Sequence, residues 1–136
     1  MERSVLKLDD HQTTALRDAG VVLCYLHGSV ALGTAHKNSD ADVAVLFERA
    51  PKDPIGATAD IIETLHGLVP SRELDVAILN EASPLLKQIV ASTGMLLYER
   101  SHDDRLRFEL RTMHEYEYAK HFVRLGREAL HEHLSA

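Results

Sequence analysis

The sequence is poor in features that define several other classes of protein. Among its 136 residues there is a single cysteine, which excludes an intramolecular disulfide. Cys24 has aliphatic neighbours in residues 21–26, which predicts a small buried side chain in a cytoplasmic protein. No run approaches the roughly 20 apolar residues that a membrane helix needs. Residues 1–10 also lack the uninterrupted apolar stretch of a secretory signal, so we expect a cytoplasmic protein with no membrane association.

An excess of basic residues is missing as well. Lys and Arg total 15 against 21 Asp and Glu, which gives a formal net charge of −6. Proteins that bind nucleic acid through its phosphates usually carry a positive field, so we expect no direct nucleic-acid binding and favour a cationic protein partner. No repeat, low-complexity tract or linker divides the chain. The length then predicts one domain over residues 1–136.

Hydrophobic periodicity and turn residues divide the chain into strands and helices. Strands are expected at residues 21–26, 42–47, 74–79 and 95–98, and helices at residues 11–19, 55–68, 84–92 and 103–134. Gly126 is the only interruption of the last segment, which leaves one long helix or a kinked pair open. The order predicts an α/β or α+β fold, with a small mixed sheet of three to four strands flanked by helices. Periodicity alone does not fix the order of the strands.

The most informative pattern joins a glycine–serine turn to three aspartates. Gly28 and Ser29 directly follow the first expected strand, while Asp40 and Asp42 lie at the start of the second. Alternation along a strand would project both aspartates to the same side. Asp75 opens the third strand and joins them if the second and third strands are neighbours. Each feature is common by itself, but their combination favours a functional site.

Acids gathered in this way suit a divalent cation. Two carboxylates held close together repel and raise each other's pKa, whereas a bound cation reverses the sign of that interaction. Carboxylate oxygens are hard ligands that favour Mg²⁺ completed by water and substrate phosphates. Metal ions at Asp40, Asp42 and Asp75 would polarise an α-phosphate and stabilise both oxygens of an in-line displacement. The pattern therefore predicts a nucleoside triphosphate that is handled with Mg²⁺.

The glycine–serine turn supplies the phosphate contacts. Gly28 lets the backbone approach a phosphate closely, and Ser29 offers both an amide and a hydroxyl. A short helix over residues 30–32 would point further N–H groups at the anion. His36 and Lys37, in the loop after Gly33, are candidates for an additional phosphate contact, although loop side chains of these types are mostly solvated.

The chain resembles the nucleotidyltransferase superfamily that shares the DNA polymerase β fold. The motif that carries the resemblance is Gly28-Ser-x10-Asp40-x-Asp42. The similarity extends to the small single-domain members called minimal nucleotidyltransferases, the MntA-type antitoxins of HEPN/MNT toxin–antitoxin systems. It covers nearly the whole chain, through residues 25–29, 39–45, 74–80, 83–86 and 94–99.

This resemblance implies an antitoxin that transfers AMP from ATP to a tyrosine hydroxyl of a HEPN-domain ribonuclease toxin. Gly28 and Ser29 would position the triphosphate, and Asp40 and Asp42 would hold two Mg²⁺ ions. Asp75 would bind the second metal and help to deprotonate the incoming hydroxyl. His27 departs from the pattern, because an aromatic such as phenylalanine is commoner before Gly-Ser, and this affects substrate detail rather than the reaction.

Two alternatives stay open at this point. A non-catalytic antitoxin could neutralise its toxin by binding and occlusion, although the complete set of acids argues against a decayed site. A small-molecule nucleotidyltransferase of the aminoglycoside-modifying kind usually carries a further helical domain for its acceptor, whereas this chain offers one C-terminal helical segment.

The C-terminal segment holds residues that we assign to surfaces rather than to chemistry. Its histidines are spaced too unevenly to share one ion, and we expect its arginines to line a solvated face: His114, His121, His131 and His133, and Arg105, Arg107 and Arg111. Its large apolar residues are expected in the core or at a partner interface: Met113, Tyr116, Tyr118, Phe122 and Leu125.

Overall fold

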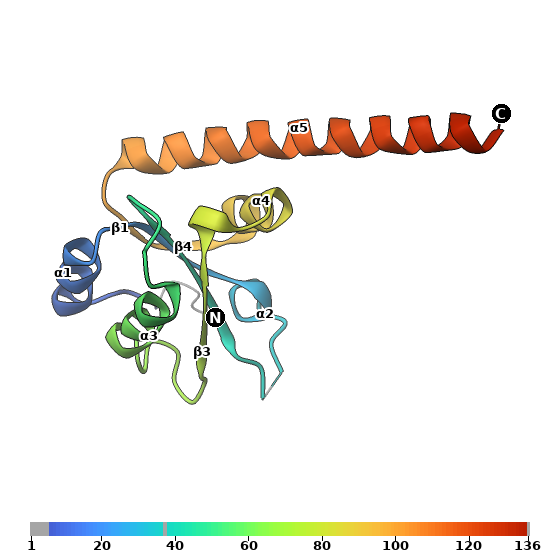
Figure 1. Ribbon diagram of the computed structural model, residues 1–136. Helices are drawn as coiled ribbons and strands as arrows, with labels where there is room; N and C mark the ends of the chain where they lie inside the picture. Colours follow the sequence, from blue (N-terminus) through green and yellow to red (C-terminus); the bar gives the residue numbers. More distant parts are fainter. Residues whose placement is uncertain (1–5, 37, 136) are drawn as a thin grey trace.

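The computed structural model describes residues 6–36 and 38–135. Within these residues four strands form one mixed sheet in the order β3-β2-β1-β4 (Figure 1). The strands are β1 (Val21–His27), β2 (Ala41–Phe47), β3 (Leu74–Ile78) and β4 (Met95–Glu99). β1 is antiparallel to both of its neighbours, whereas β2 and β3 are parallel. The expected mixed sheet of three to four strands is confirmed, and the strand order that periodicity left open is now defined.

Helices cover both faces of this sheet. They are α1 (Asp10–Asp18), α2 (Gly28–Leu32), α3 (Pro54–Thr64), the short 3-10 helix η2 (Leu79–Glu81), α4 (Pro84–Thr93) and α5 (His102–Ser135). One buried cluster joins α1 and α3 to one side of β1 and β2, and a second joins α4 and the start of α5 to the other side. Because β1 is covered on both faces, six of its seven residues are buried, which explains its continuous apolar sequence.

Helix α3 is shorter than expected. α3 ends at Thr64, not at residue 68, so the prediction of a helix over residues 55–68 was wrong at its C-terminal end. Gly67 adopts a φ of 81°, a left-handed conformation that an α-helix does not contain. The apolar spacing misled because Leu65 and Leu68 pack into the core from the turns after the helix rather than from the helix itself.

α5 is one continuous helix through Gly126, which decides between the two possibilities that the sequence left open. Its first half packs on β1, β4 and α4. Its second half extends past the rest of the molecule, on the side where α2 lies (Figure 1). In the part of the chain that the structure describes, no helix combines the length and the apolar character required to cross a membrane.

We predict that Leu65→Ala is strongly destabilising. The side chain is 0% exposed, so its truncation removes buried methyl groups and leaves a cavity that costs about 2–5 kcal/mol of unfolding free energy. The matched control is Leu130→Ala, where the same substitution is made in a side chain that is 59% exposed. Urea unfolding of both variants checks this expectation, and equal midpoints would contradict the burial of Leu65.

Candidate functional site

The strand pairing brings the predicted site residues together at one end of the sheet. His27, the last residue of β1, pairs with Asp42 near the start of β2. Asp42 in turn pairs with Asp75 on the parallel strand β3. Three ionisable side chains from three strands therefore lie side by side, although 48 and 33 residues separate Asp75 from His27 and Asp42 along the chain, by the difference of their numbers. The second and third strands are neighbours, which was the condition for Asp75 to join Asp42.

Alternation along the strands places these acids on the face that carries α4 and α5. In β2 the side chains of Val43 and Val45 enter the cluster under α1 and α3, so Asp42 belongs to the opposite face. In β3 Val76 enters the same cluster, and Asp75 again alternates to the other side. The carboxylates and the long helix α5 thus share one face of the sheet.

Asp40 lies just before β2, which begins at Ala41. The expectation that strand alternation aligns Asp40 with Asp42 stays a prediction, because Asp40 lies one residue outside the strand. Asp40 is nevertheless close enough to act on Asp42 electrostatically, since its charge contributes to the raised pKa of Asp42. The Asp40 carboxylate is therefore held at the point where the preceding loop enters β2.

Gly28 is required by its surroundings in two ways. Its φ of 76° lies in the left-handed region that L side chains rarely adopt. A Cβ atom at this position would also collide with Oδ2 of Asp42. The turn and the carboxylate are therefore packed against each other, and only glycine lets Ser29 and the start of α2 approach the acids so closely. Gly33 ends α2 with a φ of 76°, a left-handed conformation that turns the chain away from the helix.

The acids and His27 perturb one another. The pKa of Asp42 is raised by burial first, and by the charges of Asp75 and Asp40, while His27 opposes the shift. Burial lowers the pKa of His27, although Asp42 and Asp75 act in the other direction. Both shifts disfavour the charged form of a group at this edge of the sheet. A cation beside Asp42 would reverse that effect.

The donor set fits a hard divalent cation. All three acids offer carboxylate oxygens, which Mg²⁺ prefers, and their mutual repulsion is the feature that a cation relieves. Within residues 6–36 and 38–135, no three His, Cys, Asp or Glu side chains are already gathered around a point where an ion could bind. Asp40 and Asp75 are exposed and can change rotamer, so a bound cation would draw them toward the more enclosed Asp42.

Arg72 holds the loop before Asp40, a role that sequence reasoning missed. Its Nη1 atom donates hydrogen bonds to the backbone oxygens of His36 at 2.8 Å and of Ser39 at 2.6 Å. The Ala41 amide also donates to the Glu73 carbonyl at 2.9 Å. Arg72 thereby joins the segment that carries Asp40 to the start of β3. The only signal in the sequence was an arginine three residues before Asp75, which has no distinctive spacing.

The remaining loop candidates are less informative. His36 is exposed and takes part through its backbone, because its amide donates to Oγ of Ser39 at 2.8 Å. Lys37 lies outside the described residues. Neither position adds evidence for a phosphate contact beyond the one that the sequence suggested.

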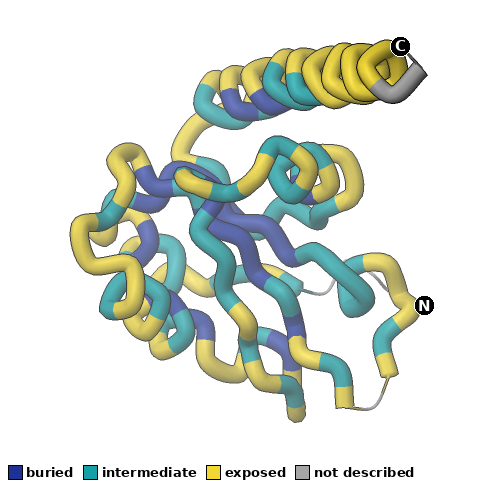
Figure 2. Tube along the Cα trace, turned by 45° about the vertical axis from the view of Figure 1, so that its right-hand side comes forward, coloured by how far each residue is buried: buried dark blue, intermediate teal, exposed yellow. Residues whose placement is uncertain are grey.

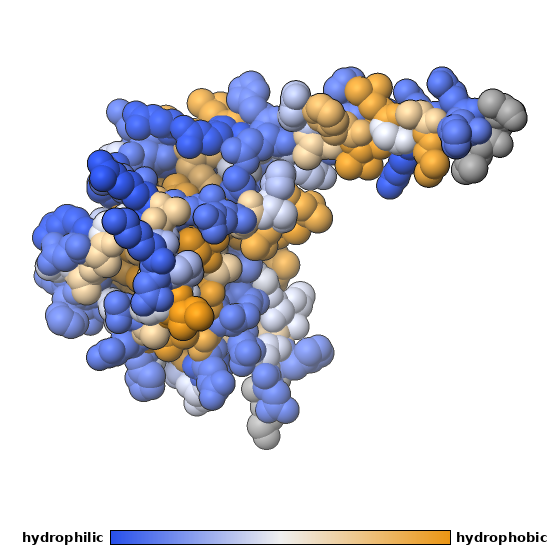
Figure 3. All heavy atoms as spheres, in the orientation of Figure 1, coloured by the Kyte–Doolittle hydropathy of each residue, from blue (hydrophilic) through white to orange (hydrophobic). Residues whose placement is uncertain are grey.

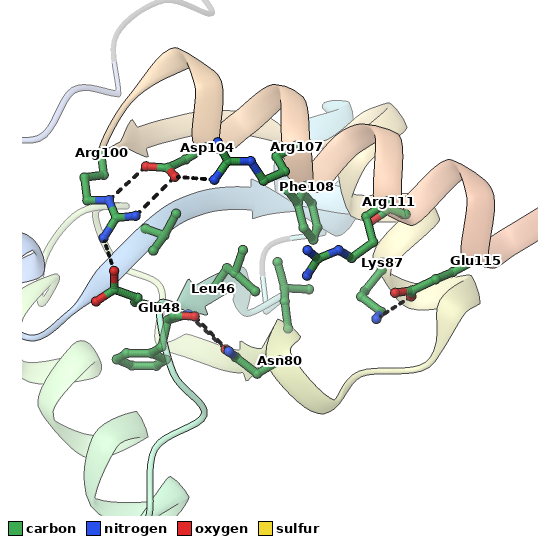
Figure 4. A pocket seen from close by; sticks show the side chains of 14 residues that line it. Leu46, Glu48, Asn80, Lys87, Arg100, Asp104, Arg107, Phe108, Arg111 and Glu115 are labelled. Carbon is green, nitrogen blue, oxygen red and sulfur yellow. Dashed lines mark hydrogen bonds and ion pairs between the residues drawn. The ribbon is translucent and has the colours of Figure 1, made fainter.

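A basic cavity lies at the opposite end of β2 from Asp42, between the first half of α5 and the sheet (Figure 4). Its cations are largely paired with acids. Arg100 contacts Asp104 at 2.8 Å and Glu48 at 2.9 Å, and Lys87 contacts Glu115 at 2.6 Å. The Lys87 pair joins α4 to α5, and the Arg100 pairs join α5 to the end of β2, so we assign the cavity to the packing of α5 and not to the reaction site.

The C-terminal residues fall on surfaces, in line with the sequence interpretation. Arg105 forms an ion pair with Glu99 at 3.0 Å, and Arg107 lies 3.9 Å from Asp104. The four C-terminal histidines are exposed. Most of the large apolar residues of this segment are also exposed, which excludes the core for them: Met113, Tyr118, Phe122 and Leu125.

The comparison with known protein families agrees with this geometry. Residues 12–103 match the family described as polymerase beta, nucleotidyltransferase. This stretch covers more than half of the chain, and it includes the Gly28-Ser29 turn and all three acids. The chain belongs to the polymerase β nucleotidyltransferase family.

Its relatives point to a more particular group. The chain is 36% identical over 96 residues to the protein adenylyltransferase MntA of Shewanella oneidensis, a match that spans 71% of this chain and 66% of the relative. It resembles a crystal structure described as the toxin–antitoxin with AMP-PNP, with a TM-score of 0.65, 32% identity, and 90% and 94% of the two chains covered. It also resembles the complex of the tri-AMPylated Shewanella oneidensis HEPN toxin with the MNT antitoxin, with a TM-score of 0.58, 28% identity, and coverage of 90% and 92%.

We predict that Gly28→Ala disrupts nucleotide binding more than it disrupts the fold. The added methyl group must displace Asp42, in addition to the roughly 1–2 kcal/mol that a left-handed conformation costs an L residue. The control is Gly67→Ala, which has a similar φ of 81° but nothing within 4 Å of the added Cβ. Binding of Mg-ATP, followed by calorimetry, should be lost in the first variant and kept in the second. Retained binding in Gly28→Ala would show that Asp42 can move aside freely.

We further predict that Arg72→Ala lowers kcat/KM for nucleotide transfer by about tenfold, the effect typical of a residue that positions a metal ligand. Without its guanidinium, the loop that carries Asp40 loses two hydrogen bonds to the start of β3. Hydrogen exchange should become faster in residues 36–41. Arg17→Ala is the control, since Arg17 is an exposed residue of α1 on the other face of the sheet. Unchanged exchange in Arg72→Ala contradicts this positioning role.

Proposed function

We propose that this protein is an Mg²⁺-dependent protein adenylyltransferase that transfers AMP from ATP to a tyrosine hydroxyl of a HEPN-domain toxin and so neutralises it. The observation that carries the proposal is the pairing of Asp42 with Asp75 beside a glycine that is packed against Asp42. Support comes from a relative named protein adenylyltransferase MntA and from similar complexes of an antitoxin with a HEPN toxin. Because ATP is the proposed donor, we place the reaction in the cytoplasm.

The turn after β1 binds and orients the nucleotide. Gly28 leaves room for the triphosphate to approach the backbone, and Ser29 offers its amide and hydroxyl to phosphate oxygens. Asp40, Asp42 and Asp75 are the residues that would hold Mg²⁺, which supplies positive charge at the α-phosphate and at the leaving oxygens. His27 directly precedes the turn and pairs with Asp42, so its half-buried ring lies beside this carboxylate.

Asp75 is the group that we assign to the acceptor. It is exposed, whereas Asp42 is partly enclosed, so a tyrosine from a second protein can reach it. In the proposed step the tyrosine oxygen attacks the α-phosphorus, the bond from that phosphorus to the bridging oxygen breaks, and pyrophosphate leaves. The phenolic proton passes to Asp75. Atoms and charge balance without any further reactant.

The decisive variant is Asp42→Asn, which keeps the size of the side chain but removes its charge. We expect AMP transfer to fall by at least about 100-fold, since the loss of a carboxylate removes metal-assisted stabilisation worth several kcal/mol. The thermal stability of the variant without Mg²⁺ should be maintained, because Asp42 is a repelled carboxylate whose pKa is raised.

The measurement is the intact mass of the HEPN toxin after incubation with ATP and Mg²⁺, combined with an assay of its ribonuclease activity. The same variant separates catalysis from occlusion. If Asp42→Asn binds the toxin normally and still silences it, neutralisation depends on binding alone and the catalytic proposal fails.

A further inference from the structure

The second half of α5 is helical although its side chains do not pack against the rest of the protein. Every side chain from Lys120 to His133 is exposed, as the yellow end of the tube in Figure 2 shows. An isolated helix of this length is marginal in water, because stability in proteins comes mainly from packing of an amphipathic face. This half of α5 therefore has the properties of an element that is completed by a partner.

Its exposed face is strongly apolar. Tyr118, Phe122 and Leu125 recur at helical spacing and are exposed, and the rings of Tyr118 and Phe122 lie with centroids 4.8 Å apart. Val123 and Leu130 extend the apolar surface around the helix. Figure 3 shows apolar side chains along this part of α5 and on α4 beneath it. So many exposed apolar side chains on one projecting helix indicate a surface that binds another molecule.

A groove lies between α5 and the beginning of α4, on a different side of α5 from Tyr118, Phe122 and Leu125. Its walls are apolar, with Pro84 and Leu85 on the α4 side and Val123 on the α5 side. The charged residues that line it are Lys120, Arg124, Arg127 and Glu117. The groove is therefore locally positive in a chain whose net charge is −6. The complementary surface is apolar at its centre and acidic at its rim.

The groove lies on the side of the molecule where the proposed reaction occurs. Asp42 and Asp75 belong to the face of the sheet that carries α4 and α5. The free half of α5 extends past the body on the side of α2, whose first residue is Gly28 (Figure 1). A protein bound under α5 on this side therefore faces the end of the sheet that carries Asp42 and Asp75.

We propose that this groove, between the start of α4 and the second half of α5, binds an acidic amphipathic helix of the HEPN toxin and delivers its tyrosine to Asp75. The inference rests on the proposed function and names the surface that selects its substrate. A second copy of this chain fits less well, because a symmetric contact would bring Lys120, Arg124 and Arg127 against their own copies. A flat lipid surface cannot enter the concave angle between α4 and α5.

The test is the affinity of the full chain for the cognate HEPN toxin, measured by calorimetry with two matched variants. Val123→Asp places a charge in the groove, and we expect the Kd to rise at least tenfold, roughly the loss of one interface hot spot. Leu110→Asp makes the same kind of change 13 residues earlier on α5, at a residue that does not line the groove and has 54% exposure against 55% for Val123. Its Kd should stay within about twofold, since a surface change away from an interface has little effect.

The charge of the partner is tested by Lys120→Glu combined with Arg124→Glu. We expect the association rate to fall about tenfold at low salt and the difference to shrink at high salt. An unchanged rate overturns the acidic character of the partner helix. Equal losses for Val123→Asp and Leu110→Asp, or no loss for either, overturn the groove. Two further results would assign the groove to another partner and so overturn the proposal. The first is that Val123→Asp abolishes dimerisation of the protein but keeps toxin binding. The second is that it abolishes binding to anionic phosphatidylserine vesicles but keeps toxin binding.

Failure here is distinguishable from failure of the proposed reaction. If the wild type binds the toxin through the groove but transfers no AMP, the groove stands and the catalytic function fails. If Val123→Asp transfers AMP with an unchanged kcat/KM, the function stands and the groove fails. Binding of Mg-ATP to Val123→Asp, which we expect to be unaltered, shows that the variant is folded.

Discussion

The contact between Gly28 and Asp42 is the constraint on which the candidate site depends. A residue without a side chain allows the turn after β1 to meet a carboxylate of β2, and a Cβ atom there would collide with it. The antiparallel pairing of β1 with β2 and the parallel pairing of β2 with β3 then fix which residues are neighbours. The backbone of the turn and the carboxylate oxygens of the candidate site are consequently held together by the same few backbone hydrogen bonds that build the sheet.

Much of this arrangement could be predicted from local sequence. The continuous apolar run of β1 and the Gly-Ser turn define the end of one strand, and Ser83-Pro84 defines the start of α4, where the Ser83 side chain accepts from the Leu86 amide. Asp75 could be placed at the start of a strand by the same reasoning. Its position beside Asp42 could not, because strand order is decided by the packing of the helices and not by periodicity.

The features that the sequence did not predict correctly also depend on tertiary contacts. The helix was expected to continue to residue 68 because apolar residues of a turn can continue a helical spacing, as Leu65 and Leu68 do after α3. Arg72 escaped notice because its function lies in hydrogen bonds to two backbone carbonyls that are distant in sequence. Backbone acceptors leave no mark on residue identity, so a single sequence cannot reveal such a contact.

The separation of α5 into a packed half and a projecting half has a consequence for how such a protein changes over generations. Side chains from Lys120 onward contribute little to the packing of the sheet, so substitutions there carry a small penalty in folding. Gly28, in contrast, is fixed by its contact with Asp42. Folding therefore leaves the projecting half free to vary within the limits that its partner sets. Two related chains could keep the same sheet and the same candidate site and still differ in the partners they accept.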